Sequence, residues 1–73
     1  MMRSTRQRDA IRQAIEEAGR PVAADEILAL AQNHVPRLGM ATVYRAIRDL
    51  LDQSWLRTVE LPGETTRYER NDL

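Results

Sequence analysis

Residues 39–53 read GMATVYRAIRDLLDQ, and this stretch decides the fold. At 100° per residue, a helix over about residues 41–53 gathers its aliphatic side chains on one side. These inward residues are Val43, Ala46, Ile47, Leu50 and Leu51. The outward side carries Thr42, Tyr44, Arg45 and Arg48, and its acids, Asp49 and Asp52, come only later. The pattern predicts a helix whose first two turns contact a partner.

Two further helices are expected before this one. In the first, over residues 5–18, apolar residues recur at spacings of three and four: Ala10, Ile11, Ala14, Ile15 and Ala18. Ser4 or Thr5 would cap it and Gly19 would end it. The second starts near Ala23 or Ala24, buries Ile27, Leu28, Leu30 and Ala31, and closes at Asn33, His34 and Pro36. We expect Gly39 to supply the turn into the third helix.

The last part of the chain predicts a β-hairpin. Residues 55–61 and 65–70 are rich in β-branched and aromatic side chains, and Pro62-Gly63-Glu64 separates them. Three helices followed by a two-stranded wing make a mainly α protein with a small β-hairpin, a winged helix-turn-helix over residues 1–73. Trp55, Leu56 and Tyr68 are expected to close the core under the wing, and His34 to be a capping or surface residue.

Composition narrows the classes of function. The 73 residues contain eleven arginines, eleven acids and one histidine, but no lysine or cysteine. A chain of this length makes one small domain, which disfavours an enclosed enzyme site. Disulfides and Cys- or His-based zinc sites are excluded, and neither a catalytic triad nor a Gly-rich phosphate loop is present, so we predict no enzyme. Lacking a long apolar stretch or a signal peptide, the chain is expected in the cytoplasm.

The formal net charge of zero at first argues against nucleic acid. The arginines are, however, unevenly distributed, because the first fourteen residues contain four of them and a single acid. Two more arginines, Arg45 and Arg48, precede the first acid of the third helix. The sequence therefore predicts a polarised molecule, although a GC-rich genome also explains why arginine replaces lysine throughout.

Two motifs carry a resemblance to a known family. Ala41-Thr42-Val43-Tyr44-Arg45 and Thr5-Arg6-Gln7-Arg8, with the turn at residues 60–63 and Arg67-Tyr68-Glu69, make residues 2–70 resemble the DNA-binding domain of the ferric uptake regulator family. The resemblance implies a bacterial transcriptional regulator, usually a metal-responsive repressor, that binds a palindromic operator as a dimer. Residues 41–53 would enter the major groove, and hairpin 55–70 would be the wing.

The resemblance also implies contacts for individual residues. Tyr44 would pack on a thymine methyl group, Arg45 would reach base edges, and Thr42 with the helix N-terminus would hold phosphate. Arg3 would enter the minor groove, and Arg8 would support a backbone contact. Arg48 could contact DNA or pair with Asp52. For Arg57 and Arg67, phosphate contact and cross-strand pairing with Glu60 or Glu69 remain alternatives.

Departures from the family pattern concern metal and dimerisation. Family members sense zinc or iron through a C-terminal domain that also forms the main dimer interface, and this chain lacks that domain. The family takes two metal ligands from the DNA-binding half; Glu69 matches one, but Pro21 replaces the other, a histidine. We therefore predict no metal in this chain, a role for Glu69 only in a longer protein, and a homodimer only with the missing domain.

A winged-helix protein-interaction module that does not read DNA alone is the alternative function. The distribution of charge on the surface distinguishes DNA binding from this alternative. DNA binding requires the basic residues on one face and the acids on the other. The basic set is Arg3, Arg6, Arg8, Arg45 and Arg48, and the acidic set is Glu16, Glu17, Asp25 and Glu26.

Overall fold

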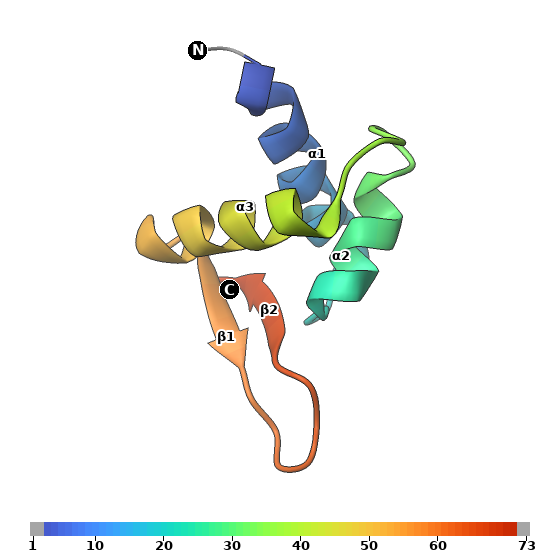
Figure 1. Ribbon diagram of the computed structural model, residues 1–73. Helices are drawn as coiled ribbons and strands as arrows, with labels where there is room; N and C mark the ends of the chain where they lie inside the picture. The colour runs from blue at the N-terminus through green and yellow to red at the C-terminus, as the bar shows by residue number, and fades with distance from the viewer. Residues whose placement is uncertain (1–2, 72–73) are drawn as a thin grey trace.

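The computed structural model describes residues 3–71, with side chains from Arg6 onward. Its elements are α1 (Arg3–Ala18), α2 (Ala24–Ala31), α3 (Met40–Asp52), β1 (Leu56–Val59) and β2 (Arg67–Arg70). The strands pair antiparallel, with Leu56 opposite Arg70 and Val59 opposite Arg67. Three helices followed by a two-stranded wing confirm the predicted winged helix (Figure 1).

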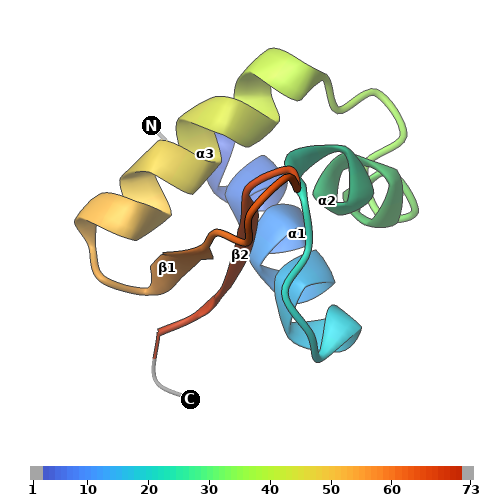
Figure 2. The same cartoon turned by 90° about the horizontal axis from the view of Figure 1, so that it is seen from below.

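The core lies where the three helices and β1 meet. Figure 2 shows α3 along one side of the molecule, with α1 and α2 beside it. Each predicted apolar stripe faces this core, and the fully buried large side chains are Ile11, Val22, Ile27, Val43 and Leu50. Leu56 is also buried, and Trp55 and Tyr68 pack against the core while partly exposed, which confirms that these three close it.

A backbone bridge attaches the wing to the segment before α2. The Val22 N–H donates to the Tyr68 carbonyl at 3.0 Å, and the Tyr68 N–H donates to the Val22 carbonyl at 2.8 Å. These two hydrogen bonds give β2 a partner on its second edge. The wing therefore starts from a fixed base beside α2.

The two ends of α3 differ from expectation. The helix begins at Met40, and its N-cap Gly39 has an ordinary extended backbone with φ −112°, so the expected special turn at Gly39 is wrong. At the other end Ser54 adopts φ +61°. Ser54 N–H donates to the Leu51 carbonyl and Trp55 N–H to the Leu50 carbonyl, at 3.0 and 2.9 Å. This is the Schellman pattern, which turns the chain sharply into β1.

α1 begins earlier than expected and ends as expected. It already includes Arg3, so Ser4 and Thr5 lie within the helix and the predicted cap at these positions is wrong. Gly19 follows the last turn with φ +63°, a left-handed conformation that glycine adopts without a Cβ penalty.

The hairpin is shorter than the predicted strands. Pairing stops at Val59 and Arg67, and residues 60–66 form the tip. Within the tip the Glu64 N–H donates to the Leu61 carbonyl at 3.1 Å, and Gly63, two residues after Leu61, has φ +74°. Pro62 followed by a left-handed glycine is typical of a type II turn. Such turns do not match the twist of paired strands, so the strands separate before they reach it.

Candidate nucleic-acid interface

The solvent-facing surface of α3, which we call the α3 face, consists of Ala41, Tyr44, Arg45, Arg48 and Asp52. All five residues are exposed, and the Tyr44 exposed fraction is 54%. On the opposite side of the helix, Val43, Ala46, Ile47 and Leu50 are buried. Because burial of this aliphatic side fixes the rotation of the helix, Tyr44, Arg45 and Arg48 face outward.

The α3 face lies centrally along the molecule. α3 crosses the middle, between the N-terminal end of α1 and the hairpin (Figure 1). The molecule measures 37 × 22 × 20 Å, so its long dimension is close to one turn of B-DNA, roughly 34 Å. A duplex that received α3 in its major groove would have the start of α1 on one side and the wing on the other.

Arg8 and Asp49 connect α1 to the flank of α3. Arg8 Nη2 lies 2.6 Å from Asp49 Oδ2, and both side chains are about two-fifths exposed. Arg45 donates from Nη2 to Thr42 Oγ1 over a long 3.5 Å. These four residues, with Gln7 and Ala46, line a hollow of about 150 Å³ between the two helices. Two of the predicted phosphate- and base-contacting arginines therefore lie at one site.

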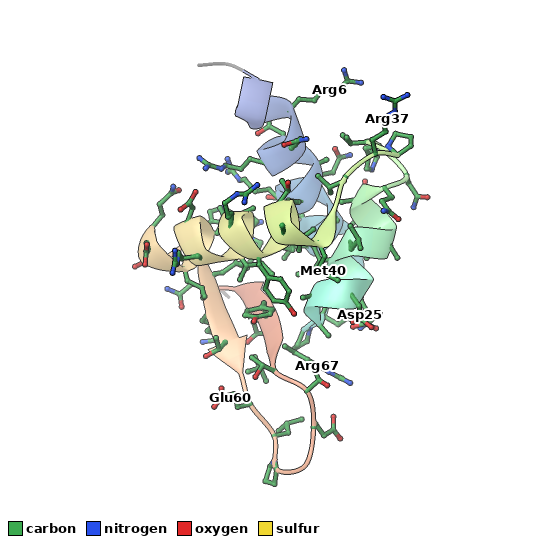
Figure 3. The ribbon with its side chains drawn as sticks, viewed as in Figure 1. Arg6, Asp25, Arg37, Met40, Glu60 and Arg67 are labelled. Carbon is green, nitrogen blue, oxygen red and sulfur yellow. The ribbon has the colours of Figure 1, made fainter. Side chains whose placement is uncertain are left out.

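Four exposed arginines have no ion-pair or hydrogen-bond partner within residues 6–71: Arg6, Arg12, Arg37 and Arg48. Arg12 nevertheless has a ring contact, because its guanidinium carbon lies 5.0 Å from the centre of the Trp55 ring. The pairing of Arg48 with Asp52 is thus not formed. Figure 3 shows Arg6 and Arg37 at the end of the molecule away from the wing. Sequence reasoning missed Arg37, although a lone cation in the connection before α3 was a usable signal.

The wing arginines are engaged with acids. Arg57 donates from Nε to Glu69 Oε2 at 2.8 Å, and its Nη2 lies 2.6 Å from the same oxygen. The two residues are directly opposite each other in the hairpin. Arg67 pairs instead with Glu64, at 3.6 Å. These contacts favour cross-strand pairing for Arg57, and phosphate contact by Arg57 or Arg67 stays a prediction.

The acids are only partly separated from the α3 face. Glu16 and Glu17 lie late on α1, where they line a hollow with Asp9 and Arg12, away from α3. Asp25 and Glu26, however, share a hollow of about 350 Å³ with Tyr44 and Met40. Asp25 and Glu26 therefore do not meet the condition that DNA binding sets for the four acids, because the start of α2 packs beside the start of α3.

Glu26 is held in its ionised form. Its Oε1 accepts the Ala23 N–H at 2.9 Å, and its Oε2 lies 3.3 Å from Arg20 Nη2. The Ala23 N–H, and then Arg20, lower the pKa of Glu26 below its ordinary value of 4.5. Since Ala23 has no polar side chain, this is one half of a capping box. The negative charge of Glu26 beside the α3 face is thus partly compensated by Arg20 and by the Ala23 N–H.

The family's metal-ligand positions do not form a metal site. Pro21 and Glu69 line one hollow, together with Glu16, Arg20 and Arg70. Glu69 is paired with Arg57, and Glu16 Oε2 lies 3.2 Å from Arg70 Nη1. Two carboxylates already engaged with guanidinium groups do not fit zinc or iron, which require about four ligands. Across the described part of the chain, no group of three or more His, Asp or Glu residues could hold a metal ion.

Within residues 3–71, none of the helices combines the length and the apolar character that crossing a bilayer requires. The longest, α1, has 16 residues and carries charged side chains throughout.

The fold and the exposed α3 face define a winged-helix domain of the kind found in transcriptional regulators. The sequence model of the ferric uptake regulator family matches residues 1–73, and the chain belongs to this family. No curated protein matches it.

Solved structures share the fold. The Campylobacter jejuni peroxide stress regulator superposes with a TM-score of 0.83 and 22% identity, covering 94% of this chain and 50% of its own. The Helicobacter pylori ferric uptake regulator, described with three functional metal binding sites, superposes with a TM-score of 0.80 and 20% identity. The match covers 89% of this chain and 43% of that regulator. PerR of Streptococcus pyogenes, described in terms of peroxide sensing and gene regulation, superposes with a TM-score of 0.77 and 26% identity. The match covers 86% of this chain and 44% of PerR. The chain thus spans half or less of the length of these regulators.

Proposed function

We propose that this chain is the sequence-specific, double-stranded DNA-binding domain of a bacterial transcriptional repressor. α3 would enter the major groove, and hairpin 55–70 would lie along the neighbouring backbone or minor groove. One observation carries the proposal: packing of the aliphatic side of α3 leaves Tyr44, Arg45 and Arg48 exposed in the centre of the molecule's long axis.

Each outward residue of α3 has a chemistry that suits DNA. The Arg45 guanidinium can donate two hydrogen bonds to guanine O6 and N7, which discriminates by about 1–3 kcal/mol against another base. The Tyr44 ring is a flat apolar surface for a thymine methyl group. Thr42 and the uncapped first turn of α3 can donate to phosphate.

The start of α1 would position the domain along the backbone. Arg6 is exposed and unpartnered among the described residues, and Arg8 lies beside α3. The proposed minor-groove contact by Arg3 lies outside the described side chains. Since phosphate contacts dominate affinity, binding should weaken steeply with salt.

A single domain of this kind reads one half-site and buries roughly 600–1,000 Å² of protein surface. We propose that the full regulator doubles the site as a homodimer, in the cytoplasm, through a C-terminal domain that also binds zinc or iron. Joining two domains would raise affinity through effective concentration.

A protein-interaction module is the second candidate, and one observation favours it. Asp25 and Glu26 line the hollow beside Tyr44, so one flank of the α3 face is acidic where a DNA phosphate would be repelled. In this case Tyr44 would be an anchor for a protein partner, and the chain would show no preference among duplexes.

Selection from a random duplex library, followed by low-salt mobility-shift assays, tests the proposal. The wild-type chain should prefer the selected duplex to a scrambled duplex of equal composition. Arg12→Ala, which removes an arginine from the hollow on α1 that Glu16 and Glu17 line, should retain the preference. Equal binding of all duplexes would contradict the sequence-specific function and favour the interaction module.

A further inference from the structure

We propose that Arg8 governs base recognition indirectly, by occupying Asp49 and so keeping the Arg45 side chain free to reach DNA. Arg8 is then a positioning residue for Arg45, in addition to any phosphate contact of its own. The inference rests on the proposed function, because it concerns the same α3 face.

Helix geometry makes Asp49 a natural competitor for Arg45. The two residues are four positions apart on α3, the spacing at which oppositely charged side chains lie beside each other. The structure shows no contact between them. Arg45 instead donates to Thr42 at a long 3.5 Å, a contact weak enough to leave its guanidinium available.

Asp49 forms no ion pair with Arg45 because its carboxylate is already paired with Arg8. From α1, its Nη2 reaches Asp49 Oδ2 at 2.6 Å, the shorter and stronger interaction in this hollow. Arg8 and Asp49 are 41 residues apart, so only the packing of α1 on α3 brings them together. Within the described residues, no other cation lies in ion-pair distance of Asp49.

The position of the pair points to function more than to stability. The side chains are 38% and 43% exposed, and ion pairs this accessible contribute little to folding. At the edge of the α3 face, however, an unpaired Asp49 carboxylate would both attract Arg45 and repel phosphate. The ion pair with Arg8, which comes from α1, removes both the attraction of Arg45 and the repulsion of phosphate.

The proposal predicts a specific pattern in four proteins: wild type, Arg8→Ala, Asp49→Asn, and the double variant. The readout is the ratio of affinities for the selected and scrambled duplexes. Arg8→Ala should lower this ratio by about twofold, because Arg45 must first leave an exposed pair with Asp49 of that strength before it can reach guanine. Asp49→Asn in the Arg8→Ala background should restore the ratio, although overall affinity stays reduced. Arg8→Lys should keep it.

Two results would overturn the proposal. If Arg8→Ala weakens both duplexes equally and leaves the ratio unchanged, Arg8 is only a phosphate contact. If the double variant keeps the low ratio of Arg8→Ala, Asp49 is not the intermediary. Circular dichroism and thermal unfolding of each variant exclude a loss of fold as the cause.

A measurement without DNA separates this proposal from the proposed function. In free protein, the NMR resonance of the Arg45 Nε–H should shift and exchange more slowly with water in Arg8→Ala, and Asp49→Asn should reverse the change. An unchanged Arg45 resonance overturns the positioning role whatever the DNA result. A wild type that shows no duplex preference, with this NMR response intact, overturns the proposed function alone.

Discussion

Arg57 on β1 and Glu69 on β2 lie directly opposite each other, with Nη2 and Oε2 2.6 Å apart. This ion pair connects the two strands at the base of the wing, and the Glu69 side chain is only 19% exposed. The same glutamate occupies the position at which the family resemblance placed a metal ligand. In this chain its partner is a guanidinium group, which makes it part of the hairpin.

Arg57→Ala should affect the wing more than DNA binding. We expect a loss of about 1 kcal/mol in the free energy of unfolding, since Glu69 is left without its cross-strand partner. The slope of log K against log salt concentration should stay unchanged. If Arg57 binds phosphate, the slope should instead fall in magnitude by about 1.

Tyr44 should matter for DNA and not for folding. Its side chain is 54% exposed, so Tyr44→Ala should change the free energy of unfolding by less than about 0.5 kcal/mol. The same substitution should weaken binding to the selected duplex, and Tyr44→Phe should retain it because the ring makes the contact. Urea unfolding and mobility-shift assays measure the two effects. Equal duplex binding by Tyr44→Ala and wild type would remove Tyr44 from the interface.

Ser54→Gly should stabilise the protein. Ser54 holds φ +61° at the end of α3, a conformation that costs an L-residue roughly 1–2 kcal/mol and that glycine adopts freely. Part of this gain is offset by the greater unfolded-state freedom of glycine, about 0.5–1 kcal/mol. We expect a net gain of about 0.5–1 kcal/mol in thermal or urea unfolding. Ser54→Ala, which keeps the Cβ, is the control and should show no such gain.

Glu26→Gln should reduce stability in a pH-dependent way. The Ala23 N–H and Arg20 lower the pKa of Glu26 in the folded state, so its carboxylate stabilises the fold above the ordinary pKa of 4.5. This contribution should disappear as the pH falls below 4.5 through the folded-state pKa. Urea unfolding at pH 7 should therefore separate wild type from Glu26→Gln, and the two curves should converge at low pH. A difference that stays constant with pH would show that the lowered pKa is not the cause.

The helices were predictable because each buries one continuous stripe. Val43, Ala46, Ile47 and Leu50 repeat at the helical period, and each of them is buried. The same periodicity fixed which side of α3 faces solvent. The outward residues Tyr44, Arg45 and Arg48 followed from it without knowledge of the tertiary structure.

Features that depend on how elements pack were not predictable. Arg8 pairs with Asp49, which lies 41 residues later in the chain, and no local sequence spacing predicts such a partner. Asp25 and Glu26 lie beside Tyr44 only because the start of α2 packs against the start of α3. The left-handed Ser54 was missed because sequence rules assign that position to glycine.

The central claim is that Arg45 reads a base, and one measurement tests it most directly. Affinities of wild type and Arg45→Ala are measured for the selected duplex and for a series in which each guanine is replaced singly. For wild type, one replacement should cost about 1–3 kcal/mol, and for Arg45→Ala that replacement should cost nothing further. If Arg45→Ala loses affinity equally for every duplex, or if both proteins respond alike to every replacement, Arg45 does not read a base and the account is contradicted.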